Sequence, residues 1–232
     1  MATAEDPATR PDLRRALVTG GLGRVGEAIA RRLEREEWSV LAAGRADGDV
    51  SRPKEARALV ERAARELGGL DLVVNAAGEG FAPKPVEELT EADWDAAFGA
   101  TAKGSFFVTQ AAAPHLRASR GCVVMIEDVA AYQPWPSFAA HSAAKAAQAM
   151  LTRVLARALA PEVRVVGVAP GPVAVPPDQE ERRAAETLLG RVGEPEEVAD
   201  AVAFLAHARF VTGSTLFVDG GRLLQTGRAR FA

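Results

Sequence analysis

Short, nearly all-apolar runs alternate along this chain with longer segments of helical periodicity, and this alternation limits the folds it can adopt. Strands that are apolar on both faces are typical of parallel sheets covered by helices on both sides. We therefore expect a single-domain α/β fold, a doubly wound parallel sheet of about seven strands with helices on both faces. The apolar runs lie at residues 16–18, 39–43, 70–74, 122–126, 163–168 and 215–218, with a stub at 47–50.

Helix signals fill the segments between these runs. Thr90 and Asp93 have the pattern of a capping box, which predicts a long helix beginning near Trp94. We expect residues 1–13 to form a flexible tail and residues 14–232 a single domain. A loop at residues 170–190 follows a strand's carboxyl end, so it is expected to flank a ligand. Periodicity predicts further helices at residues 25–33, 56–67, 138–160 and 195–206.

The composition narrows the class of protein. The 232 residues are 48% hydrophobic and 25% charged, which is the balance of an ordinary globular domain. A net charge of −3 gives no electrostatic reason to expect nucleic acid or an anionic membrane as a partner, and no apolar run approaches membrane-spanning length. Cys122 is the one cysteine, so no internal disulfide is expected, and the polar start is unlike a signal peptide. These features favour a cytoplasmic protein that binds small molecules.

The first apolar run leads directly into a glycine-rich turn, Thr19 to Gly26, and then into a predicted helix. Small residues at Gly20, Gly23 and Gly26 permit a tight turn and the close approach of a ligand, while the amino end of the helix attracts phosphate. A strand, this turn and a helix in that order predict a Rossmann-type dinucleotide site. The alternative is a purely structural turn.

The end of the second predicted strand bears on which dinucleotide is bound. An acidic side chain there would bind the 2′-hydroxyl of NAD, whereas an arginine accommodates the 2′-phosphate of NADP. The chain has Arg45 at this point and no acidic residue before Asp47. Arg45, together with Arg24 in the glycine turn, favours NADP(H). In the alternative, Asp47 folds back to the ribose.

A group of proton-handling residues lies in the middle of the chain. His141 and Lys145 are four residues apart on a predicted helix and share one face, and Asp128 follows the apolar run at residues 122–126. An Asp–His pair near a lysine can perform acid–base chemistry near neutral pH. The alternatives are a packed histidine, an aspartate that only caps a loop, and a solvated lysine. The other two histidines form no metal-ligand pattern, so we expect no metal.

These motifs together resemble the short-chain dehydrogenase/reductase family over residues 15–224, in the order in which that family carries them. Asp49-Val50 resembles the pair that contacts the adenine ring, Asn75 to Gly78 the motif along the cofactor, and Pro170 to Val173 the motif beside the nicotinamide. The resemblance implies a cofactor site formed by Gly20, Gly23, Arg24, Val25, Gly26, Arg45, Asp49, Val50, Asn75, Ala76, Ala77, Lys145, Pro170, Gly171 and Val173.

The same resemblance implies which residues perform the chemistry. In the family a tyrosine transfers the proton, a lysine four residues later binds the nicotinamide ribose, a serine holds the substrate carbonyl, and an asparagine supports a water relay. Lys145 keeps its place, whereas His141 stands at the tyrosine, Asp128 at the serine and Thr101 at the asparagine. One helix that is usual in the family is missing between the second and third strands.

Several departures are shared with bacterial pteridine-reductase-like members, which the chain resembles most. These are Arg24 in the glycine motif, Asp128 at the serine position, and Phe81, which resembles the phenylalanine that stacks on the pterin. The resemblance implies an NADP(H)-dependent oxidoreductase that reduces a carbonyl or a pterin-type C=N bond by hydride transfer. Because His141 replaces the tyrosine, the alternative is a cofactor-binding pseudoenzyme that acts as a redox-sensing or partner-binding module. Family members pair into dimers and tetramers, which implies a homo-oligomer.

Overall fold

Six parallel strands form one sheet in the computed structural model, which describes residues 14–79 and 82–225. Their order across the sheet is β2-β1-β3-β4-β5-β6, so the predicted single α/β domain with a doubly wound parallel sheet is confirmed. The strands are β1 (Arg15–Thr19), β2 (Ser39–Ala43), β3 (Leu72–Asn75), β4 (Cys122–Ile126), β5 (Arg164–Pro170) and β6 (Thr215–Val218).

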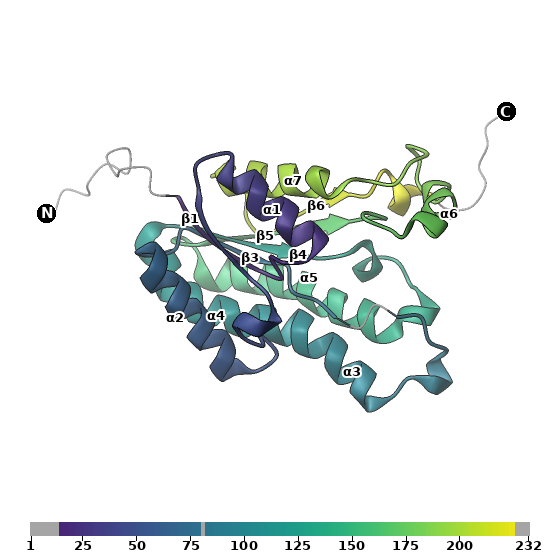
Figure 1. The fold of residues 1–232 in the computed structure, drawn as a ribbon, viewed down its shortest axis with the longest axis horizontal. Coiled ribbons are helices and arrows are strands. Elements are labelled where there is room, and N and C mark those ends of the chain that lie inside the picture. The colour runs from purple at the N-terminus through teal and green to yellow at the C-terminus, as the bar shows by residue number, and fades with distance from the viewer. Residues whose placement is uncertain (1–13, 80–81, 226–232) are drawn as a thin grey trace, which may run out of the picture.

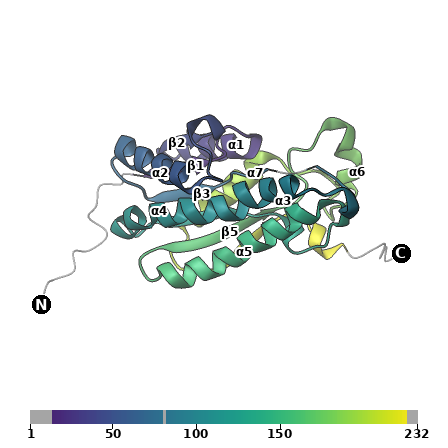
Figure 2. The ribbon, with the colours of Figure 1, turned by 90° about the horizontal axis from the view of Figure 1, so that it is seen from below.

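Helices cover both faces of the sheet (Figures 1 and 2). One face carries α1 (Arg24–Glu34) and α7 (Pro195–His207). The other carries α2 (Pro53–Leu67), α4 (Gly104–Ser119) and α5 (Ala139–Leu159). α3 (Glu91–Phe98) packs against α5, and the short α6 (Glu180–Ala184) follows β5. None of the helices in the described ranges is both long and apolar enough to cross a membrane.

Each central strand sends alternate side chains into two hydrophobic cores, because successive residues of a strand point to opposite faces. Leu17 packs into the core beneath α2 and α4, whereas its neighbours Ala16 and Val18 pack into the core beneath α1 and α7. β4 repeats the pattern, with Val123 and Met125 in the first core and Cys122, Val124 and Ile126 in the second. Burial on both faces explains why the strands are apolar throughout.

The predicted long helix begins at Glu91, with Thr90 as its N-cap. Asp93 N donates to Thr90 Oγ1 at 3.2 Å, and Thr90 N donates to the Asp93 carboxylate at 3.0 Å, which confirms the capping box. The helix is not uniform, because α3 leads into a π-helical turn, Gly99–Lys103, before α4 begins. A π turn inserts an extra residue into a helix and is frequent at functional sites. This π turn carries Thr101.

The described sheet has six strands rather than about seven, because the predicted stub at residues 47–50 is not a strand. Arg45–Asp47 forms a 3-10 turn instead, and the Asp47 carboxylate closes it by accepting a hydrogen bond from Gly44 N at 2.9 Å. Only residues 44–52 separate β2 from α2. A further parallel strand would need a crossover connection of about a dozen residues or more. β2 is therefore the edge of the sheet.

The segment predicted to be a loop at residues 170–190 contains regular structure. β5 continues to Pro170, and the segment then holds a 3-10 turn at Pro177–Gln179 and helix α6. α6 has glutamates in its first turn and arginines in its last, which suits the helix dipole. The prolines of this segment lie before α6 and not within it.

Candidate active site

The carboxyl ends of the strands meet along one edge of the sheet. The register pairs Thr19 with Asn75 and Asn75 with Met125, so β1, β3 and β4 end at nearly the same level. β5 pairs with Met125 through Gly167 and runs three residues farther, to Pro170. β2 lies on one side of β1 and β3 on the other, which makes β1 the point where the strand order reverses. Open α/β sheets bind ligands beyond the strand ends at such a point.

The glycine-rich turn lies at this reversal point. Gly20 has a φ of +68°, and a Cβ there would lie 2.6 Å from the carbonyl oxygen of Ala76. A Cβ on Gly26 would overlap the carbonyl oxygen of Gly20, so the first turn of α1 packs directly on the glycine turn. Gly23 is the N-cap of α1. This packing brings the amino end of the helix to the strand ends, where it favours an anion.

A cleft of about 300 Å³ lies beside the turn. Its walls come from the ends of β1, β2 and β3, the segment before α2, α2 itself and the π turn, and they are built mostly of glycine, alanine and other apolar residues. Small walls of this kind leave room for an adenosine-sized group. Seven of the predicted cofactor residues line the cleft: Gly20, Gly23, Arg45, Asp49, Val50, Ala76 and Ala77.

Other predicted cofactor residues lie around the cleft rather than in its walls. Arg24 is exposed at the first residue of α1, and Val25 packs against the core beneath that helix. Gly26 serves the turn through its lack of a side chain. Asn75 is buried at the end of β3, where its Nδ2 donates to Thr109 Oγ1 at 3.1 Å.

Two buried polar atoms near the cleft have no hydrogen-bond partner among the described residues, Asn75 Oδ1 and Thr101 Oγ1. Thr101 is fully buried in the π turn, and a Cβ on Gly78 would lie 3.8 Å from its hydroxyl. Buried polar groups are normally paired. These two atoms and the glycine-lined cleft therefore fit the binding of a polar ligand such as a dinucleotide.

The acidic and basic residues after β2 have different partners. Arg45 forms a two-point ion pair with Glu79, in which the Nη1 to Oε1 distance is 3.1 Å. One carboxylate oxygen of Asp47 accepts a hydrogen bond from Gly44 N, and the other accepts one from Arg62 Nη2 at 3.1 Å. Asp47 is thus engaged in its own turn and is not among the residues that line the cleft. Sequence reasoning did not identify Glu79.

Asp128 and His141 lie together, as their placement in the sequence predicts. His141 Nε2 is 3.4 Å from Asp128 Oδ2, a long polar contact, and both side chains are largely shielded from solvent. The other oxygen of Asp128 accepts a hydrogen bond from Ala130 N at 2.7 Å. Asp128 therefore both caps the turn after β4 and contacts the histidine. An arrangement of this kind can hold and move a proton.

Lys145 is buried one helical turn beyond His141, which excludes the solvated-lysine alternative. Its Nζ donates to the carbonyl oxygen of Ile126 at 2.7 Å and to Gln148 Oε1 at 3.1 Å. An ammonium group carries three N–H donors, so one remains for a ligand. Burial lowers the pKa of Lys145, and the charges of Asp128 and Glu127 act in the opposite direction.

Sequence reasoning missed a buried carboxylate directly before Asp128. Glu127 is 2% exposed and accepts hydrogen bonds from Thr152 Oγ1 at 2.6 Å, Tyr132 OH at 2.7 Å and Thr215 Oγ1 at 3.1 Å. Burial raises the pKa of Tyr132 to about 12, so its hydroxyl stays a donor. The partners come from α5, the turn after β4, and β6. This network ties three elements to the end of β4.

The predicted nicotinamide-side residues lie at the end of β5. Pro170 is paired with Val218 of β6, and Gly171 N donates to the Val218 carbonyl oxygen at 3.0 Å. Val173 lines a different hollow of about 410 Å³, which it shares with Leu188 and residues at the end of β6. The structure therefore places Pro170 and Gly171 beside the end of β6, and Val173 lies farther along the segment.

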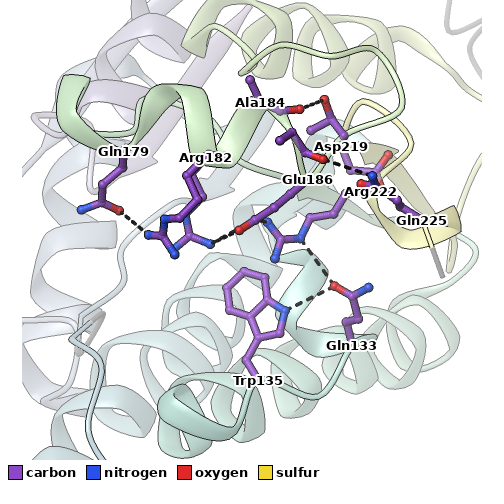
Figure 3. Close-up of polar contacts among 12 residues, drawn as sticks. Gln133, Trp135, Gln179, Arg182, Ala184, Glu186, Asp219, Arg222 and Gln225 are labelled. Atoms are coloured by element: carbon purple, nitrogen blue, oxygen red, sulfur yellow. Dashed lines mark hydrogen bonds and ion pairs between the residues drawn. The ribbon is translucent and has the colours of Figure 1, made fainter. Parts of the chain in front are cut away.

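A polar cluster joins three segments on this side of the molecule (Figure 3). The Glu186 carboxylate forms ion pairs with Arg222 and with Arg183. The distance from Arg183 Nη1 to Glu186 Oε2 is 3.1 Å. Arg222 lies over the Trp135 ring, 4.7 Å from its centroid, and Trp135 Nε1 donates to Gln133 Oε1 at 3.3 Å. The cluster holds together the loop after β4, the 170–190 segment and the residues that follow β6.

The remaining predicted site residue is Phe81, on the substrate side. It lies outside the described residues, so its role stays a prediction. Elsewhere, the described ranges contain no group of three or more His, Cys, Asp or Glu side chains that could hold a metal ion.

Comparisons with known proteins cover nearly the whole chain. A family model described as enoyl-(acyl carrier protein) reductase matches residues 22–222. A 4-formylbenzenesulfonate dehydrogenase from Comamonas testosteroni is 36% identical over 89% of this chain and 96% of its own length. The 3beta-hydroxysteroid dehydrogenase 1 of Eggerthella lenta is 35% identical over 91% of this chain and 94% of its own. A 3-ketoacyl-(acyl-carrier-protein) reductase from Brucella melitensis, solved in complex with NADH, superposes with a TM-score of 0.86 at 27% identity, over 90% of this chain and 98% of that chain.

The glycine turn generates a test of its packing. Gly26→Ala should lower the free energy of unfolding by about 1–3 kcal/mol, the usual range for overpacking, because the new methyl group overlaps the Gly20 carbonyl. Gly23→Ala is the matched control, since a Cβ there would meet only Gly20 O, at 3.4 Å. Urea denaturation measures the free energy of unfolding of both variants and of the unmodified protein. Equal losses in the two would show that the close packing of α1 on the turn is not what constrains Gly26.

Proposed function

Because the chain belongs to the short-chain dehydrogenase/reductase family of oxidoreductases, we propose that it transfers hydride between NADP(H) and a carbonyl or pterin-type C=N group. One arrangement carries the proposal. The cleft at the end of β1 and the group formed by Asp128, His141 and Lys145 lie along the same edge of the sheet. A dinucleotide that extends along this edge would bring its reactive ring beside that group.

Different residues along this edge bind different parts of the cofactor. In our proposal the adenosine half occupies the cleft, and the amino end of α1 with Arg24 meets the phosphates. Lys145 donates its remaining N–H to a ribose hydroxyl. Arg45, at the end of β2, supports NADP(H), because a guanidinium group pairs well with a 2′-phosphate. When bound, the nicotinamide ring supplies a hydride to the substrate carbon or accepts one from it.

Reduction also requires a proton at the substrate oxygen or nitrogen, and His141 is the proposed donor. Its Nε2 is 3.4 Å from Asp128 Oδ2, so the carboxylate can orient the ring and stabilise the imidazolium form. Thr101 Oγ1, buried and without a partner among the described residues, fits a water that returns protons to the site. In oxidation the same groups act in reverse.

Two substrate classes have support. The names of the relatives refer to a formyl compound, a hydroxysteroid and a ketoacyl group, which are carbonyl or alcohol substrates. A pterin-type C=N substrate is favoured by Asp128 and Arg24, because pteridine-reductase-like members carry the same residue types at these places. We therefore place carbonyl substrates first and pterins second.

The first test of the proposal concerns the cofactor. NADPH should bind more tightly than NADH, and Arg45→Ala should weaken NADPH binding by about 1.5 kcal/mol or more, as expected for a hydrogen bond to a charged group. NADH binding should change little. Calorimetric titration measures both affinities, and Arg209→Ala, which removes an exposed arginine far along the chain, is the control. Equal affinities of the unmodified protein for the two cofactors would contradict the NADP(H) assignment.

The second test separates the enzyme from the pseudoenzyme. His141→Ala should abolish NADPH oxidation in a screen of small ketones, aldehydes, quinones and pterins, while NADPH affinity stays within about twofold, since His141 is assigned to the proton and not to the cofactor. His141→Tyr serves as the matched variant. The pseudoenzyme is favoured if the unmodified protein binds NADPH but none of the screened compounds leads to NADPH oxidation. Activity of His141→Tyr would strengthen that conclusion. Turnover by His141→Ala at the unmodified rate would remove the histidine from the mechanism.

Association with a second copy is also proposed, through the β6 edge of the sheet. Phe204 on α7 is 61% exposed, Phe210 is fully exposed, and Phe217 on β6 is 42% exposed. α7 packs beside β6, and large exposed apolar side chains on neighbouring elements favour an interaction surface there. Analytical ultracentrifugation should find a dimer or tetramer, and Phe204→Asp should reduce its size, while Val86→Asp, at an exposed apolar residue of another segment, should not. A monomeric unmodified protein at tens of micromolar would exclude the association.

A further inference from the structure

Arg45 and Glu79 come from two different strand ends and meet at the rim of the cleft. Arg45 lies just after β2 and lines the cleft, and Glu79 follows Gly78, which lines it from the end of β3. Both guanidinium nitrogens of the terminal fork contact the two carboxylate oxygens, with Nη1 to Oε1 at 3.1 Å. A planar fork of this kind takes one bidentate anionic partner at a time.

Arg45 is the one cationic side chain among the described residues that line the cleft. The other acidic groups of this corner are differently placed. Asp47 is bound to Gly44 N and Arg62, and Asp49 Oδ1 accepts a hydrogen bond from Ser51 N at 3.0 Å. Glu79 is therefore the carboxylate that occupies the Arg45 fork.

The pair contributes little to the stability of the fold. The Arg45 side chain is 61% exposed and that of Glu79 42%, and exposed ion pairs stabilise proteins only weakly. A weak pair at this place nevertheless matters to a ligand. Any anion that approaches the Arg45 guanidinium must displace the Glu79 carboxylate or share the fork with it, and it also meets the charge of that carboxylate.

We propose that Glu79 sets the cofactor preference by competing with the 2′-phosphate of NADP(H) for Arg45. This inference rests on the proposed function and adds a residue to its specificity. To bind a 2′-phosphate, the Arg45 guanidinium must give up the Glu79 carboxylate. Part of the binding free energy that the phosphate gains from Arg45 is therefore lost. With a 2′-hydroxyl, the ion pair stays closed, and the carboxylate is of the type that accepts a hydrogen bond from that hydroxyl. Glu79 thus narrows the preference for NADP(H) that Arg45 alone would produce.

The test uses two probes that differ only in the group at issue, 2′,5′-ADP and 5′-AMP. Glu79→Gln should strengthen 2′,5′-ADP binding roughly threefold to tenfold, a range that corresponds to releasing one exposed ion pair and one like charge. Binding of 5′-AMP should stay the same or weaken slightly. The gain should shrink at high salt, because exposed charges are screened there. Isothermal titration calorimetry of the full chain measures all of these affinities.

Two further proteins complete the design. In an Arg45→Ala background, Glu79→Gln should strengthen 2′,5′-ADP binding by less than half of the change it causes in the protein that keeps Arg45. The reason is that the guanidinium for which the two anions compete is then absent. Glu87→Gln, which neutralises an exposed glutamate on another segment, should leave both affinities unchanged. Thermal unfolding of Glu79→Gln should match that of the unmodified protein, so that a change in binding is not a change in folding.

The outcomes distinguish this inference from the proposed function. If 2′,5′-ADP binds the unmodified protein and Glu79→Gln leaves that affinity unchanged or lowers it, competition for Arg45 is wrong and the cofactor site stands. An equal gain for both probes would also overturn the competition, because it would reflect a general change in the cleft. If neither probe binds the unmodified protein, the cofactor site itself is wrong and the role of Glu79 falls with it.

Discussion

The hydrogen bond from Lys145 Nζ to the carbonyl oxygen of Ile126, at 2.7 Å, fixes α5 against the end of β4. α5 carries its polar side chains on one face, at the spacing of successive helical turns, so anchoring one of them positions the others. His141 then faces Asp128, and the Glu127 carboxylate, directly before Asp128, accepts a hydrogen bond from Thr152. β4 is in register with β3, whose end borders the cleft. Anchoring α5 on β4 therefore also fixes the position of His141 and Lys145 relative to the cleft.

The same anchor places a positive charge where there is little water. A buried ammonium group destabilises a fold unless opposite charges and hydrogen-bond acceptors compensate it. Three consecutive residues at the end of β4 provide both, since Ile126 offers a carbonyl oxygen while Glu127 and Asp128 raise the pKa of Lys145 against the effect of burial. The hydroxyl groups around Glu127 keep that carboxylate in place. The polar interior of this protein is thus organised around one strand end.

Local patterns in the sequence predicted most of the fold and the placement of His141 and Lys145 on one helical face. The apolar runs predicted the strands, Thr90 and Asp93 predicted a helix start, and helical spacing brought His141 and Lys145 to one face, because each signal acts over a few residues. The strand stub at residues 47–50 was wrong, since the turn closed by Asp47 is also a local structure and leaves no room for a crossover.

Contacts between distant segments could not be predicted in this way. Glu79 is 34 residues from Arg45, and Thr215 is 88 residues from Glu127, so neither pair leaves a periodic signal. Both pairs depend on which strands become neighbours in the sheet. The π turn at Gly99–Lys103 was also missed, because a helix that gains one residue keeps nearly the same local propensities.

That π turn has a consequence for how the chain tolerates changes in length. An α-helix advances by about 100° per residue, so the extra residue held in the turn sets the rotation of everything that follows it. Val108, Ala112 and Leu116 anchor α4 in the core beneath the sheet, whereas α3 has only Ala97 buried among its residues. A single-residue deletion between Gly99 and Lys103 would relax the turn into ordinary α-helix and rotate α3 by about 100° relative to α4. The helix would be more regular, and α3 would present a different face to α5.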